Sequence, residues 1–155
     1  MVENEFIKRT LKVSKTIAMV GVSSIKKEVS TNIRRRPSTI VMKYMQEFGY
    51  RVIPVNPFSA GEKLYGEIIV PKLEDIDIPI DIVDVFRPEK DAPELAMQTI
   101  KIKAKVLWLQ YGIRSDEAKK IVESKNISYI SNKCIKQEYQ RLFLKVNPVF
   151  PALKK

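Results

Sequence analysis

The chain has 155 residues, 45% of them apolar, which fits one compact domain with a substantial core. It contains no histidine and one cysteine, Cys134, which excludes Ser-His and Cys-His catalytic pairs, an internal disulfide and a zinc site of the usual type. The formal net charge of +10 is uneven: residues 1–51 carry 11 basic and 4 acidic side chains, residues 52–100 carry 4 and 10, and residues 101–155 carry 13 and 4.

The first half of the chain predicts two helices and two strands. Apolar spacing predicts an amphipathic helix over residues 3–12, and Thr16–Val20 is a short apolar run that predicts a buried strand. A second helix is expected over residues 38–48, with Ser38 as its N-cap and Gly49 just beyond its end. Residues 50–57 predict the second strand.

The second half predicts three further strands alternating with helices. Apolar runs predict strands at 80–86, 105–110 and 127–130. A short helix is expected at 71–75, and longer helices at 91–102, 116–124 and 135–144. Ser115 is the expected N-cap of the helix at 116–124. The expected fold is therefore α/β: a doubly wound, five-stranded parallel sheet of order 3-2-1-4-5 with an extra N-terminal helix. A single domain is expected over residues 1–155, with its core at about 14–145.

Nothing in the sequence predicts a membrane or secreted location. No apolar run reaches the roughly 20 residues that span a bilayer, and the N-terminus lacks the apolar segment of a signal peptide. A lone cysteine suits the reducing cytoplasm, which is the expected location.

Ligands of doubly wound sheets bind beyond the carboxyl ends of the strands, at the switch point, expected here between the first and fourth strands. Four connections would meet there: 21–38, 56–58, 86–88 and 110–113. In the first of them, Gly21 permits a sharp turn, and the residues after it offer backbone amides and hydroxyls to a phosphate. The arginines 34–36 supply cations for a phosphate, or else form a solvated charge run.

The end of the second strand bears on which nucleotide would bind. NAD sites usually place an acidic residue there to hold the ribose hydroxyls, whereas this chain reads Val55–Asn56–Pro57. This disfavours NAD and permits a ligand with an additional ribose phosphate, such as NADP or coenzyme A.

Several segments together resemble the small stand-alone CoA-binding proteins. They are VGVSS and RPST in the first connection, then GYRVIPVNP, IDIVDVFRP, AKVLWLQYGI and NKCIKQEYQRLF, in the same order as in that family. The resemblance covers about residues 16–143 and implies a Rossmann-like fold similar to the CoA-binding domain of the succinyl-CoA synthetase alpha subunit. It implies that coenzyme A, or an acyl-CoA, binds across the rim of the sheet.

The resemblance also implies a set of cofactor-binding residues. By this resemblance, the phosphates of CoA contact Gly21, Val22, Ser23, Arg36 and Ser38. The adenosine end lies near Asn56 and Pro57, and Phe86 and Arg87 line the site. The pantetheine side borders Gln110 and Gly112. Two departures stand out. The connection from Ser23 to Pro37 is several residues longer than is usual in the family, and three roles are open for residues 24–36: a lid ordered by the ligand, a contact with another partner, or a mobile loop. Asn132–Lys133–Cys134 replaces the family's Asp-Arg-Cys.

Two other residues have both a chemical and a structural interpretation, and a third has a structural one only. Cys134 is either a thiol near the CoA thiol or a packed core residue, and the packing role is favoured. Asp84 lies within an apolar strand, which favours a buried, hydrogen-bonded carboxylate over a ligand contact. Trp108 is expected in the core.

The leading functional hypothesis is a non-catalytic CoA-binding protein whose ligand changes the surface shown to an unidentified protein partner. An enzyme is the alternative: an NADP-dependent reductase, or an acyl-CoA ligase subunit that borrows catalytic residues. The net charge raises nucleic acid as a third ligand class, which no helix-turn-helix, zinc-finger or RNA-binding motif supports.

Overall fold

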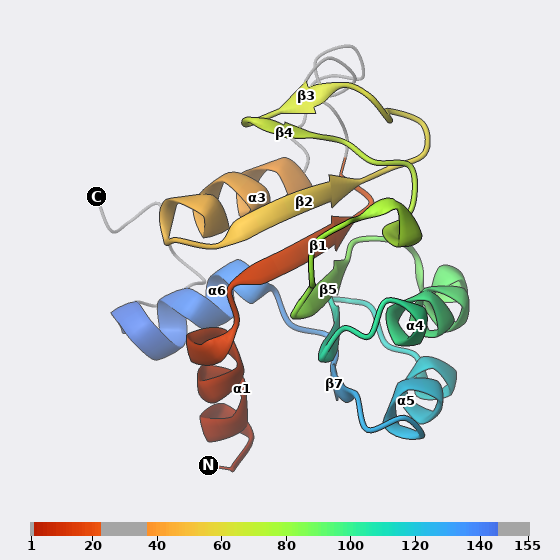
Figure 1. The fold of residues 1–155 in the computed structure, drawn as a ribbon. Coiled ribbons are helices and arrows are strands. Elements are labelled where there is room, and N and C mark those ends of the chain that lie inside the picture. Colours follow the sequence, from red (N-terminus) through yellow and green to blue (C-terminus); the bar gives the residue numbers. More distant parts are fainter. Residues whose placement is uncertain (1, 23–36, 146–155) are drawn as a thin grey trace.

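The computed structural model describes residues 2–22 and 37–145, and its centre is a parallel five-stranded sheet (Figure 1). In chain order, the strands of this sheet are β1 (Thr16–Val20), β2 (Arg51–Val55), β5 (Ile82–Val85), β6 (Val106–Leu109) and β7 (Ser128–Ile130). They lie in the order β2-β1-β5-β6-β7, and every pair is parallel. The predicted α/β fold class is confirmed, including the N-terminal helix.

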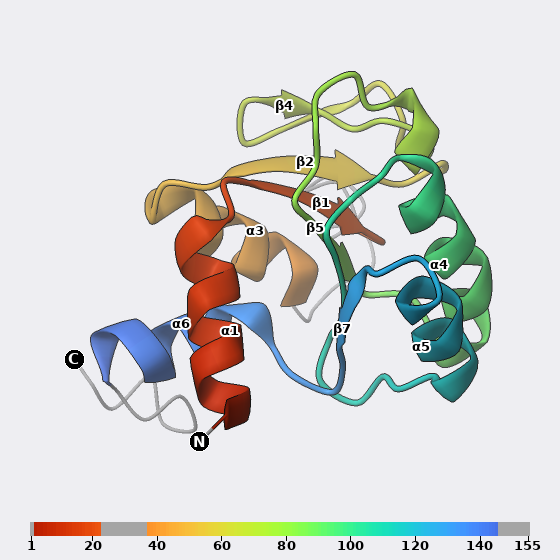
Figure 2. The same cartoon turned by 60° about the horizontal axis from the view of Figure 1, so that its bottom comes forward.

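Helices cover both faces of the sheet (Figures 1 and 2). One face carries α1 (Val2–Val13), α3 (Pro37–Glu47) and α6 (Ile135–Tyr139). Helix α6 continues as a π-helical turn (Gln140–Leu144). The other face carries α4 (Ala92–Lys101) and α5 (Asp116–Glu123). The long connection after β2 contains a small hairpin of β3 (Lys63–Leu64) and β4 (Glu67–Ile68), then a 3-10 turn (Leu73–Asp75). A second 3-10 turn (Glu89–Asp91) precedes α4.

The strands are apolar on both sides because each face packs against helices. In β1, Ile17 and Met19 belong to the core beneath α1, α3 and α6, whereas Ala18 and Val20 belong to the core beneath α4 and α5. Successive strand residues point to opposite faces, so a strand with two covered faces has no polar alternation. This explains why the continuous apolar runs in the sequence predicted the strands correctly.

The predicted strand order, 3-2-1-4-5, is wrong. The third strand of the sheet in chain order, β5, pairs with β1 and not with β2. Val70 occupies the outer edge of β2 with two backbone hydrogen bonds. Its N–H donates to the Pro54 carbonyl at 3.0 Å, and its carbonyl accepts from the Asn56 N–H at 2.9 Å. The chain therefore crosses to the free side of β1, and the switch point lies between β1 and β5.

The helix ends confirm some of the capping predictions. Ser115 caps α5, its hydroxyl oxygen accepting from the Ala118 N–H at 3.1 Å, and Gly49 follows α3 with φ +99°. Ser38 is not the N-cap of α3, since the helix already begins at Pro37. The sequence could not exclude this start, because proline is also favoured in the first turn of a helix.

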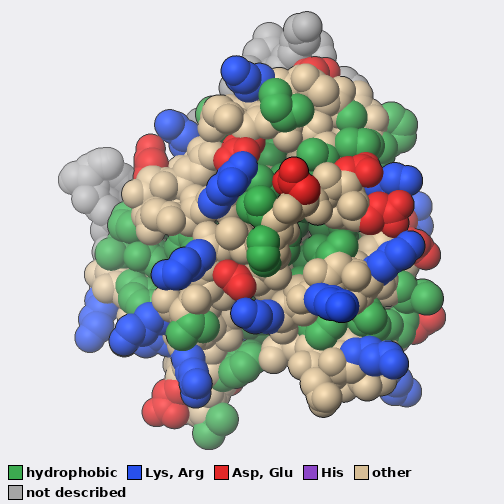
Figure 3. Space-filling view, viewed as in Figure 1, with side chains coloured by type: hydrophobic (Ala, Val, Ile, Leu, Met, Phe, Trp, Pro, Cys, Tyr) green, Lys and Arg blue, Asp and Glu red, His purple; other side chains and the backbone are tan. Residues whose placement is uncertain are grey.

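The visible surface carries charges of both signs. Figure 3 shows lysine and arginine side chains spread over this face and interspersed with acidic ones. Among the helices that the structure describes, none has the length and apolar content needed to cross a bilayer. Residues 2–22 and 37–145 also contain no group of three or more cysteine or acidic side chains placed to hold a metal ion.

Candidate functional site

Gly21 brings the carboxyl ends of three strands together. It follows β1 with φ +97°, and its N–H donates to the Val55 carbonyl of β2 at 2.9 Å. A Cβ atom at this position would lie 3.2 Å from Cδ of Arg87 and 3.3 Å from the carbonyl carbon of Phe86, both just beyond β5. Glycine is therefore required twice, for the left-handed backbone and for the close approach of the next strand.

We expect Gly21→Ala to lower the free energy of unfolding by about 2–3 kcal/mol, since it adds crowding to backbone strain. Gly61→Ala is the matched control: Gly61 has φ +91° but no atom within 4 Å of the added Cβ, so strain alone should cost about 1 kcal/mol. Urea unfolding of both variants measures the difference. Equal losses would show that the contact with Phe86 and Arg87 does not constrain the turn.

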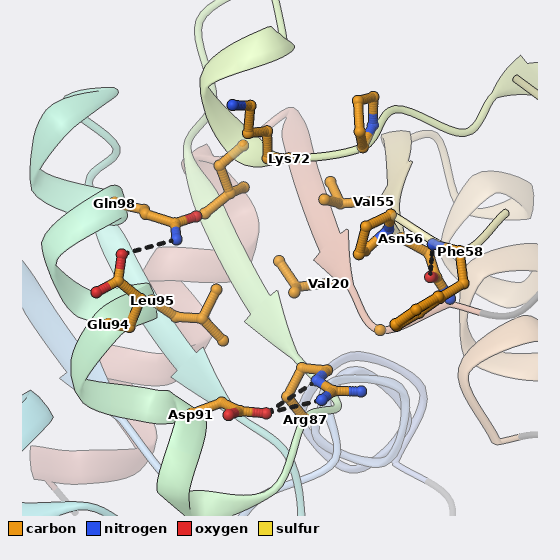
Figure 4. A pocket seen from close by; sticks show the side chains of 14 residues that line it. Val20, Val55, Asn56, Phe58, Lys72, Arg87, Asp91, Glu94, Leu95 and Gln98 are labelled. Carbon is orange, nitrogen blue, oxygen red and sulfur yellow. Dashed lines mark hydrogen bonds and ion pairs between the residues drawn. The ribbon is translucent and has the colours of Figure 1, made fainter. Parts of the chain in front are cut away.

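A cavity of about 440 Å³ lies beside this turn, between the ends of β1 and β2 and helix α4 (Figure 4). Its walls are mostly apolar, formed by Val20, Val55, Leu73 and Leu95, with prolines at positions 57 and 71. Phe58, which is 77% exposed, stands at its mouth. An apolar slot with a few polar groups on its rim suits a flat organic ring carrying polar substituents.

Asn56 lines the cavity, but both ends of its amide are engaged by the backbone. Its Nδ2 donates to the Val22 carbonyl and its Oδ1 accepts from the Phe58 N–H, both at 2.8 Å. The side chain therefore ties the connection after β1 to the one after β2. It shapes the cavity wall, and each end of the amide keeps one further hydrogen-bonding position.

Among the residues that the structure describes, two cations line the cavity, and each is paired with an acid. Arg87 donates from Nη2 and Nε to Oδ2 of Asp91, at 2.8 Å and 3.1 Å, and Lys72 lies 3.3 Å from Glu74. The side chain of Arg87 is 44% exposed and that of Asp91 31%, so both are accessible to a ligand. An incoming phosphate would compete with Asp91 for the guanidinium.

Helix α4 supplies a further polar pair to the wall. Nε2 of Gln98 donates to Oε2 of Glu94 at 3.2 Å, one helical turn away (Figure 4). Asp91, Glu94 and Gln98 were not among the residues expected at the site. They are spaced three, four and seven residues apart, which places them on one face of a helix. This spacing is the sequence signal that could have identified them.

Four of the sequence-predicted residues line the cavity: Gly21, Asn56, Pro57 and Arg87. Val22 and Phe86 pack instead against the core on the α3 face, and Ser38 is buried in the first turn of α3. Ser23 and Arg36 lie outside the described residues, as does the proposed lid at 24–36.

Gln110 and Gly112 lie at the same end of the sheet, beyond β6, and make structural contacts. Oε1 of Gln110 accepts from the Ile135 N–H at 3.2 Å, at the start of α6. The N–H of Gly112 donates to Oδ1 of Asn132 at 2.7 Å. Both contacts join the end of β6 to the segment after β7, so the replacement of an acid by Asn132 keeps an oxygen acceptor for Gly112.

Trp108 and the two residues with two interpretations lie in or against the core. Trp108 is fully buried, as predicted, with its indole N–H donating to the Lys133 carbonyl at 2.8 Å. Cys134 is partly buried against the same core, directly before α6. Asp84 is fully buried, but the predicted hydrogen bonding is wrong: neither carboxylate oxygen has a partner in the part of the chain that the structure describes. Burial raises the pKa of Asp84 well above its usual value.

Comparisons with known proteins give the family of the chain. The sequence profile of the CoA binding domain matches residues 15–140. An uncharacterised protein of Bacillus subtilis, YneT, is 40% identical over 130 residues, which cover 84% of this chain and 89% of that protein.

Two solved structures are also similar. The cell-free ID.343 protein of Thermus thermophilus is 35% identical with a TM-score of 0.81, covering 90% of this chain and 98% of its own. A hypothetical protein from Pyrococcus horikoshii OT3 is 36% identical with a TM-score of 0.79, covering 90% and 91%. The match over most of the chain and the shared fold show that this protein belongs to the CoA-binding domain family.

Proposed function

We propose that the protein binds coenzyme A, or an acyl-CoA, at the carboxyl ends of β1, β2 and β5, and that it has no catalytic role of its own. The observation that carries the proposal is the apolar cavity beside the Gly21 turn, with Arg87 on its rim, in a chain of the CoA-binding domain family. In this arrangement the adenine ring enters the cavity. The phosphates lie toward Gly21 and Arg87, where a close backbone approach and a guanidinium are available.

The end of β2 supports CoA over NAD. The ribose diol of NAD is usually held by a carboxylate at this position, and Asn56 has already used both amide ends in backbone contacts. Its Oδ1 keeps one further acceptor position and carries no negative charge, whereas a carboxylate accepts from both hydroxyls. A ribose that carries a phosphate needs a cation in its place, and Lys72 lies on the same cavity wall.

No reaction is assigned to the site. A ligase of the succinyl-CoA synthetase type would need a histidine from another chain, because this sequence has none. The proposed mechanism is differential binding: the ligand stabilises one arrangement of the rim, which a protein partner then recognises.

Calorimetric titration with CoA, NADP and NAD tests the assignment. We expect CoA to bind at least about tenfold more tightly than NAD, since the cations match its extra phosphate and no acid matches the free diol. Duplex DNA at two salt concentrations is the control for unspecific attraction to a chain of net charge +10. Equal or reversed affinities for CoA and NAD would overturn the proposal, and strongly salt-dependent DNA binding without CoA binding would favour nucleic acid.

A further inference from the structure

The hydrogen bond between Glu94 and Gln98 determines which end of the Gln98 amide faces the cavity. A carboxylate only accepts hydrogen bonds, so the amide atom 3.2 Å from Oε2 of Glu94 must be the nitrogen. The amide oxygen then points away from Glu94, toward the cavity, as Figure 4 shows. The wall thus offers a hydrogen-bond acceptor at this point.

The surroundings make this acceptor selective. Leu95 and Leu73 lie beside Gln98 on the cavity wall, and both are buried. Glu94 is exposed and Gln98 half-buried, so a ring that packs against these leucines would itself displace water from the amide. A polar ring atom that does not match the protein atom facing it would then lose its hydration without compensation. A ring that places a donor opposite the Gln98 oxygen is therefore favoured over a ring that places an acceptor there.

We propose that Gln98, oriented by Glu94, selects adenine among nucleobases by accepting a hydrogen bond from its exocyclic amine. This inference rests on the proposed function, because it assumes that the base of CoA enters the cavity. Hypoxanthine, the deaminated form of adenine, has a carbonyl oxygen in place of the amine and would set two acceptors against each other. Glutamine recognises adenine through the same amine in protein–DNA complexes.

The test compares CoA with its deaminated analogue, in which hypoxanthine replaces adenine and the phosphates and pantetheine are unchanged. Both ligands carry the same charge at neutral pH, so the ratio of their dissociation constants cancels the electrostatic contribution of the site. We expect the wild-type protein to prefer CoA by about tenfold or more. Gln98→Ala should retain CoA binding and reduce the ratio to about one.

Glu94→Lys provides a sharper variant. A lysine at this position donates to the Gln98 oxygen and turns the amide nitrogen toward the cavity, so the preference for CoA should disappear or reverse. Glu117→Lys makes the same charge change on α5, at an exposed position outside the cavity wall, and should leave the ratio unchanged.

The outcomes separate this inference from the proposed function. Tight binding of both ligands with equal affinity would leave CoA binding in place and overturn the role of Gln98. An unchanged ratio in Gln98→Ala, or in Glu94→Lys, would overturn it as well. If the wild-type protein bound neither ligand, the proposed function and this inference would both be wrong.

Discussion

Asp84→Asn should stabilise the protein, and the gain should grow with pH. Asp84 lies between Met19 and Trp108 on the neighbouring strands, fully buried, and neither of its oxygens has a partner in residues 2–22 and 37–145. Burial raises the pKa of its carboxyl in the folded state. As pH rises above the unfolded chain's ordinary carboxyl pKa of about 4, the unfolded chain therefore loses the proton first and the folded protein keeps it.

The sign follows from proton linkage. The unfolded chain binds fewer protons above about pH 4, so rising pH favours unfolding of the wild-type protein, by about 1.4 kcal/mol per pH unit until the folded carboxyl also ionises. Asparagine has a similar shape and does not titrate. The difference in unfolding free energy between Asp84→Asn and wild type should therefore widen at that rate in urea titrations at several pH values.

Asp81→Asn is the matched control, with the opposite sign. Burial raises the pKa of Asp81, but backbone hydrogen bonds from Lys15 and Thr16, together with the charge of Lys105, outweigh it and hold the pKa below its usual value. Its ionised form stabilises the fold above the unfolded pKa, and this contribution disappears as pH falls through the lowered folded pKa. Asp81→Asn should thus destabilise the protein at neutral pH and cost little stability in acid.

One outcome would contradict the Asp84 prediction. If the unfolding free energies of Asp84→Asn and wild type change in parallel with pH, Asp84 is ionised in the folded protein.

Arg87→Ala should weaken CoA binding by about 10- to 150-fold with little change in melting temperature. A charge-assisted hydrogen bond to phosphate contributes roughly 1.5–3 kcal/mol, whereas the partly exposed pair with Asp91 contributes at most about 1 kcal/mol to folding. Calorimetry and thermal unfolding separate the two effects. Arg9→Ala removes one positive charge from an exposed position on α1, which precedes the amino end of β1, and should leave CoA affinity nearly unchanged.

Asp91→Asn tests the same pair from the other side. Removing the carboxylate frees the guanidinium of Arg87 for the ligand, so CoA affinity should increase.

Each of the two variants has an outcome that would contradict its prediction. If Arg87→Ala lowers the melting temperature and leaves the CoA affinity unchanged, Arg87 is structural. A weaker affinity in Asp91→Asn would mean that the carboxylate itself contacts the ligand.

The predicted doubly wound sheet indicated the rim at which a ligand is expected, and the family resemblance added coenzyme A as that ligand. Local motifs predicted part of the cavity wall at this rim. Gly21 and Arg87 were identifiable because each directly follows a predicted strand, and strand ends meet at one rim of a parallel sheet. The contribution of α4 was missed because the sequence does not say which face of a helix borders a cavity. Asn56 was identified as a ligand contact, but its amide is engaged by Val22 and Phe58, one of them 34 residues away.

The sequence alone determined the α/β class, the approximate extents of strands and helices, and the burial of both faces of the sheet, because these follow from local apolar spacing. Only the tertiary structure decided the strand order, since it depends on Val70 covering the outer side of β2 from 15 residues beyond Val55. It also decided that Asp84 has no hydrogen-bond partner in the described chain and that Gln98 presents an oxygen to the cavity. These properties depend on which atoms surround a side chain, and residues distant in sequence or on adjacent helical turns supply those atoms.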